Sequence, residues 1–130
     1  MTIIIILATI TMMQYVGINK KARDSARRAD IYELSAALEV NKDTESYKPL
    51  QTGQFSSFQW KDPKGSAYCI GVGNPSDPGD IPNWGSTCPS GFNPVSPGEP
   101  EGIFYAWKVC TFLEIPASGQ SNVFCRSSSQ

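Results

Sequence analysis

The sequence predicts an α+β protein in which a long N-terminal α-helix protrudes from a small antiparallel β-sheet. An uncharged apolar run over residues 1–18 is followed by residues 20–42, which contain neither proline nor glycine. After this helical region, short segments rich in β-branched and aromatic residues lie in the second half of the chain. With 130 residues, the chain is too short for two independent cores. We therefore expect one long helix packed on a small sheet that carries a long, disulfide-tied loop.

Residues 1–18 form the apolar half of the predicted helix. They carry no charge, and as a helix they span about 27 Å, close to the hydrocarbon thickness of a bilayer. A secretory signal peptide would begin with a basic region, and a helix of a globular core would not be apolar on every face. We expect this segment to lie in lipid or inside a protein assembly. The predicted assembly surface consists of Ile3, Ile4, Ile5, Ile6, Leu7, Ile10, Met12, Met13 and Val16.

Residues 19–45 form the amphipathic half of the same helix. Residues 2–41 together would extend about 60 Å, whereas a globule of this chain length is about 30 Å across, so the helix must project from its own domain. Gly17 is the weakest internal point, and a local break is expected there. Three apolar residues lie on one stripe and are expected to pack on the sheet: Ile31, Leu34 and Leu38.

The charge is distributed unevenly along the chain. Residues 19–28 carry a net charge of +4, whereas the whole chain carries −1, so the remainder carries −5. A basic block beside an apolar helix is typical of the cytoplasmic side of a membrane. We expect this basic collar either to pair with acidic groups of neighbouring subunits at the edge of a helix bundle, or to be a solvated face. Its members are Lys20, Lys21, Arg23, Arg27 and Arg28.

Four cysteines in the C-terminal domain, residues 46–130, predict two disulfides. None lies in a C-x-x-C pair and the chain has no histidine, so a zinc site is poorly supported. An even number in a small, loop-rich domain favours disulfides and an oxidising compartment, which outweighs the cytoplasmic signal of the basic collar. Three pairings are possible, besides four reduced thiols. The pairing of neighbours is preferred: Cys69–Cys88 and Cys110–Cys125.

Three short segments are predicted strands: residues 67–72, residues 103–113 and residues 123–125. Between the first two, residues 73–102 hold seven prolines and six glycines and are predicted to form a loop tied down by Cys88. The aromatic residues of this domain form either a disulfide-backed core, which we prefer, or a sugar-binding or surface-binding face. They are Trp60, Trp84, Phe92, Phe104 and Trp107.

The composition argues against catalysis and against metal chemistry. The absence of histidine removes the commonest general base and the commonest metal ligand. Asp77 and Asp80 are weak candidates for calcium binding, but their spacing matches no dedicated calcium motif, and turn residues are the better interpretation. We predict no catalytic residue, no cofactor and no metal. The near-neutral net charge also argues against general nucleic-acid binding.

At residues 21–38, KARDSARRADIYELSAAL, the chain resembles the amphipathic half of the long helix in type IV pilins and type II secretion pseudopilins. The segment DPKGSAY, residues 62–68, resembles the pseudopilin entry into the first strand, and Leu113-Glu114 resembles the end of a later strand. The order of these segments carries the resemblance, which leaves the proline- and glycine-rich loop unmatched. Ile5 stands where the family has a glutamate. Either the N-terminus is truncated, or the assembly tolerates an amine without that partner.

The resemblance implies a structural subunit of an extracellular type IV-like pilus, a homopolymeric helical filament with roles such as adhesion, motility or DNA uptake. It also implies a prepilin peptidase, N-terminal methylation and an inner-membrane assembly machinery as partners. The chain would reside in the bacterial inner membrane before assembly and at the cell surface afterwards. Nucleic acid would be a partner only of a DNA-uptake pilus.

The alternatives within the family are a secretion pseudopilin and a minor or tip pilin. A more distant alternative is a membrane-anchored enzyme or ligand-binding domain that uses Glu99, Glu101 or Glu114.

Overall fold

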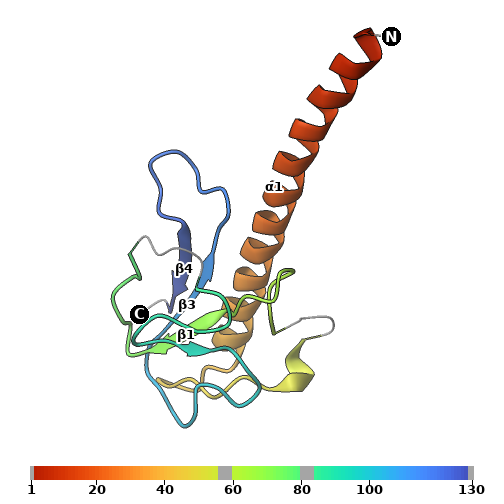
Figure 1. Cartoon of the computed structure of the whole chain (residues 1–130). Coiled ribbons are helices and arrows are strands. Elements are labelled where there is room, and N and C mark those ends of the chain that lie inside the picture. The colour runs from red at the N-terminus through yellow and green to blue at the C-terminus, as the bar shows by residue number, and fades with distance from the viewer. Residues whose placement is uncertain (1, 56–59, 80–83, 129–130) are drawn as a thin grey trace.

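The computed structural model describes residues 2–55, 60–79 and 84–128, without the side chains of residues 2–5 and 7–13. One long helix is followed by a four-stranded antiparallel sheet, which is the expected α+β architecture (Figure 1). The elements are α1 (Thr2–Val40), a 3-10 turn (Thr52–Gln54), β1 (Cys69–Val72), β2 (Asn93–Pro94), β3 (Trp107–Phe112) and β4 (Val123–Ser127).

Helix α1 is a single rod whose N-terminal half extends away from the sheet (Figure 1). Its 39 residues correspond to a length of about 58 Å. The break expected at Gly17 is absent, because helical structure continues through this residue and on both sides of it. A glycine costs a helix only about 1 kcal/mol relative to alanine, which is too little to interrupt a helix of this length.

The sheet has the strand order β2-β1-β3-β4, with every pair antiparallel. Strand β3 begins at Trp107 rather than at the expected residue 103, because Phe104 instead forms a bridge with Tyr47 after the helix. Strand β4 extends to Ser127, beyond the expected end. The two-residue strand β2 was not expected, since it lies inside the loop rich in proline and glycine.

One face of the sheet packs against the C-terminal half of α1. The stripe of Ile31, Leu34 and Leu38 is fully buried there, as predicted. Its partners on the sheet alternate along each strand, as the pleat requires. They include Tyr68, Ile70, Trp107 and Val109.

The opposite face of the sheet is covered by the loop between β1 and β3. Both predicted disulfides form on this face: Cys69–Cys88 ties the loop to β1, and Cys110–Cys125 joins β3 to β4. The core interpretation of the aromatic residues is confirmed, because all but one are buried and the last packs against the core. The buried residues are Trp84, Phe92, Phe104 and Trp107, and the partly buried one is Trp60.

The loop approaches β1 so closely that only glycine fits at position 71. A Cβ atom on Gly71 would lie 2.4 Å from Cγ of Pro75 and 3.1 Å from the Phe92 ring. We expect Gly71→Ala to destabilise the protein by about 1–3 kcal/mol through overpacking, measured by urea unfolding. Gly53→Ala is the matched control, because its Cβ would meet no atom within 4 Å. Equal stability of the two variants would contradict this close packing.

Candidate assembly site

The projecting half of α1 presents large apolar side chains to solvent. Tyr15, Val16 and Ile18 are 67%, 56% and 62% exposed. Of the predicted assembly surface, Val16 and Ile6 are thus exposed. The other members lie outside the described side chains: Ile3, Ile4, Ile5, Leu7, Ile10, Met12 and Met13.

Within the described part of the chain, no helix combines the length and the apolar character needed to cross a membrane. The prediction of a membrane-spanning segment rests on residues 1–18, most of whose side chains lie outside the described part.

We call the C-terminal domain, residues 46–130, the head. Where α1 meets the head, a buried guanidinium joins three segments of the chain. Arg27 is only 1% exposed. Its Nε donates to Oδ2 of Asp62 at 2.7 Å, and its Nη1 donates to Oδ1 of Asp24 at 2.8 Å. Its Nη2 lies 3.1 Å from Oε1 of Glu114. We call Arg23, Asp24, Arg27, Asp62 and Glu114 the anchor cluster.

The carboxylates of the anchor cluster are also bonded to the backbone. Asp24 accepts the N–H groups of Glu114 and Ile115, at 2.9 and 2.7 Å. Asp62 accepts those of Lys64 and Ser66, at 2.8 and 2.7 Å. Because a buried ion pair is tolerable only when its remaining hydrogen-bonding capacity is used, these bonds are what allow the cluster to be buried. They hold the helix, the loop before β1 and the segment after β3 in one arrangement.

Arg23 adds a bidentate pair at the edge of the anchor cluster. Its Nε and Nη2 donate to the two carboxylate oxygens of Glu114 at 2.7 and 2.8 Å. These bonds, with the charge of Arg27, lower the pKa of Glu114 to about 2, although partial burial opposes them. Asp30 behaves oppositely: it accepts a hydrogen bond from the Tyr68 hydroxyl, but burial raises its pKa.

The structure corrects part of the hypothesis that the basic collar pairs with neighbouring subunits. Arg23 and Arg27 are bound to carboxylates of their own chain, and Arg27 is buried. Arg28 lies over the ring of Phe124, 4.7 Å from its centroid. Within the described residues, Lys20 and Lys21 make no ion pair, and they remain as cations that a neighbour could meet. The reason is topological, since two of the three carboxylate partners of Arg27, Asp62 and Glu114, lie 35 and 87 positions away, beyond any local pattern.

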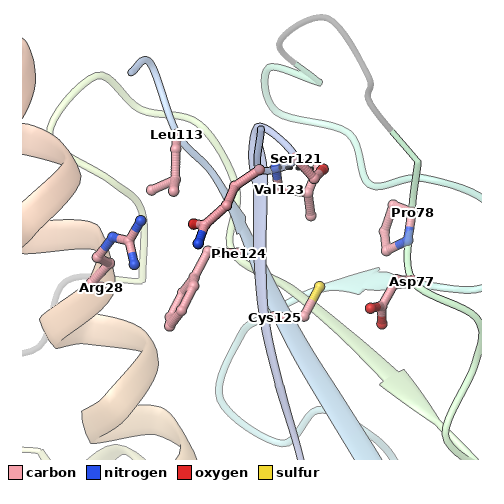
Figure 2. Close-up of a pocket in the computed structure, with 9 residues that line it drawn as sticks. Arg28, Asp77, Pro78, Leu113, Ser121, Val123, Phe124 and Cys125 are labelled. Atoms are coloured by element: carbon pink, nitrogen blue, oxygen red, sulfur yellow. Dashed lines mark hydrogen bonds between the residues drawn. The ribbon is translucent and has the colours of Figure 1, made fainter. Parts of the chain in front are cut away.

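A hollow of about 320 Å³ lies around β4, beside the basic collar. Figure 2 shows Arg28 on the helix side of this strand and Asp77 with Pro78 on the other side, while Phe124 points toward the helix. Asp77 pairs with Nζ of Lys108 at 2.5 Å, and Asp80, the other calcium candidate, lies outside the described residues. Among the described residues, no three acidic or cysteine side chains are placed so that they could hold a metal ion.

The carboxylates of the distant enzyme alternative are not gathered in one site. Glu114 belongs to the anchor cluster. Glu99 lies beside the segment that follows α1, where the backbone N–H of Leu50 donates to the carbonyl of Glu99, and Glu101 is in the same loop.

No family model, curated protein or solved structure matches the chain.

The low pKa of Glu114 predicts a loss of stability in acid. Because the folded-state pKa lies below the ordinary value of 4.5, ionised Glu114 stabilises the fold above that pH. This contribution decreases as the pH falls from 4.5 and is largely lost near pH 2. We expect Glu114→Gln to lower the free energy of unfolding by about 1.5–3 kcal/mol at pH 7. The difference from the parent chain should shrink steadily toward pH 2 in urea titrations.

Glu101→Gln is the control, because Glu101 is exposed and makes no ion pair within the described residues. A difference between Glu114→Gln and the parent chain that stays constant across this pH range would contradict the assignment.

Proposed function

We propose that this chain is a structural subunit of an extracellular type IV-like filament that assembles through the projecting half of α1. One observation carries the proposal: a continuous helix extends well beyond its own head and exposes Tyr15, Val16 and Ile18 to solvent. Burial of such exposed apolar side chains against a partner would be favourable by a free energy of about 25 cal/mol per Å² of surface removed from water.

Copies of the same helix are the partners that this surface fits. Among the described residues, the core of the head packs on the C-terminal half of α1, and the N-terminal half extends away from the sheet (Figure 1). Packing of one helix on different positions of the next is a heterologous contact, which extends into a helical fibre when it does not close. Lys20 and Lys21 lie where the apolar part ends and can pair with acidic groups of a neighbour.

The disulfides are consistent with a head that works outside the cytosol. Both cysteine pairs are closed, and such bonds persist in oxidising compartments. We infer residence in the bacterial inner membrane before assembly and at the cell surface afterwards. The family-level alternatives, a secretion pseudopilin or a minor or tip subunit, would use the same helix but form short or sparse filaments.

The proposal is tested by electron microscopy of material sheared from cells that express the chain. We expect abundant thin filaments from the parent chain. The double variant Val16→Asp/Ile18→Asp should give a filament yield lower by about tenfold or more, because charged groups would be buried between helices. The head should still fold, as judged by near-ultraviolet circular dichroism.

Val40→Asp is the matched control, since Val40 is 81% exposed on the same helix but at its opposite end. Filament yield should be unchanged in this variant. A parent chain that forms no filaments and is recovered only as a detergent-soluble monomer would overturn the proposal and favour the membrane-anchored domain.

A further inference from the structure

One cation of the basic collar is exposed and has no carboxylate of its own chain. Lys21 is exposed and makes no ion pair among the described residues. Its neighbour Lys20 is half-buried and lines a hollow together with Lys64 and Glu114 of the head. The three arginines of the collar are bound to carboxylates or lie over an aromatic ring, as described above. Lys21 is therefore the collar charge that a second molecule can reach most freely.

Helix α1 also carries one carboxylate without a charged partner. Glu33 is exposed and makes no ion pair among the described residues. The other acidic residues of the helix are engaged: Asp24 belongs to the anchor cluster, Asp30 accepts from the Tyr68 hydroxyl, and Glu39 accepts from the Tyr47 hydroxyl. The helix thus presents one available positive charge and one available negative charge.

These two charges lie on opposite flanks of α1. At 100° per residue, Lys21 lies roughly 105° to one side of the mean direction of the buried stripe, and Glu33 lies roughly 135° to the other side. Two parallel copies can therefore lie side by side with both heads pointing the same way, so that the Lys21 flank of one meets the Glu33 flank of the next. Because the two flanks differ, each copy keeps one flank for a further copy, which is a heterologous contact.

The spacing of the charges determines how far such copies are displaced. Lys21 and Glu33 are twelve positions apart, so they come level when neighbouring helices are displaced by about 18 Å along their axes. The neighbour's uncharged N-terminal segment then lies beside residues 22–30 of this chain. Three exposed residues of that part share a helical stripe with Glu33, and all three are small and uncharged: Ala22, Ala26 and Ala29. Val40 lies beyond the neighbour's apolar half, so the control variant Val40→Asp places no charge against it.

We propose that Lys21 of one copy pairs with Glu33 of the next, and that this pair sets the axial displacement of parallel helices in the filament. The inference rests on the proposed function, because the pair exists only between assembled copies. An exposed ion pair contributes little affinity, but like charges brought together would oppose the contact. The pair therefore selects one displacement rather than providing the strength of assembly, which comes from the apolar half.

Zero-length crosslinking of intact filaments tests this contact directly. A carbodiimide joins an amine to a carboxylate only when the two groups touch. Within one chain, Lys21 and Glu33 lie about 18 Å apart along a continuous helix, so an amide between them can only link two copies. We expect mass spectrometry of the digested filaments to identify two peptides joined through Lys21 and Glu33. Filaments in which Lys21 is joined to other carboxylates but not to Glu33 would overturn the inference.

Charge reversal tests the same contact through assembly. Lys21→Glu and Glu33→Lys should each lower filament yield by about fivefold or more, because each places like charges together. The double variant Lys21→Glu/Glu33→Lys should restore the yield to within about twofold of the parent chain, since opposite charges meet again. The matched control is Lys20→Glu/Glu33→Lys, in which the yield should stay low. Both substituted side chains of the double variant are exposed, and near-ultraviolet circular dichroism should show an unchanged head.

The failure of this inference differs from the failure of the proposed function. Filaments from the parent chain without rescue by Lys21→Glu/Glu33→Lys, or with equal rescue by Lys20→Glu/Glu33→Lys, would overturn the Lys21–Glu33 pair alone. A parent chain that forms no filaments would overturn the proposed function and this inference together.

Discussion

The buried guanidinium of Arg27 is the contact on which the arrangement of this protein depends. It binds carboxylates from the helix, from the loop before β1 and from the segment after β3. A buried charge is stable only with its partners in place. The helix therefore cannot slide or rotate against the head without exposing the Arg27 guanidinium to solvent or separating it from these carboxylates. The anchor cluster therefore determines which side of the projecting half faces away from the head, and hence which surface a neighbouring helix would meet in the proposed filament.

The rod and the head are stabilised by different means. In the head, the helix stripe covers one face of the sheet and the disulfide-tied loop covers the other, which gives a short chain two apolar layers. In the projecting half of α1, the described side chains Tyr15, Val16 and Ile18 have no such cover, and in the proposed filament they are covered by lipid or by other copies. The chain thus combines a head with two apolar layers and a helix half whose described apolar side chains are exposed.

Much of this organisation could be predicted from local sequence patterns. The rod, the stripe of Ile31, Leu34 and Leu38, and the two disulfides follow from periodicity and cysteine spacing. The anchor cluster could not be predicted, because Asp62 and Glu114 are distant in sequence and nothing local marks them as partners of Arg27. For the same reason, Arg23 and Arg27 looked like surface cations.

The most direct test of the anchor is a double-mutant cycle between Arg27 and Asp62, measured by urea unfolding of the full-length chain. Arg27→Met and Asp62→Asn should each cost about 3–5 kcal/mol, because each removes one member of the buried Arg27–Asp62 ion pair. The double variant should be less destabilised than the sum of the two by about 2 kcal/mol or more. Additive effects within about 0.5 kcal/mol would show that the two groups do not interact and would contradict the account.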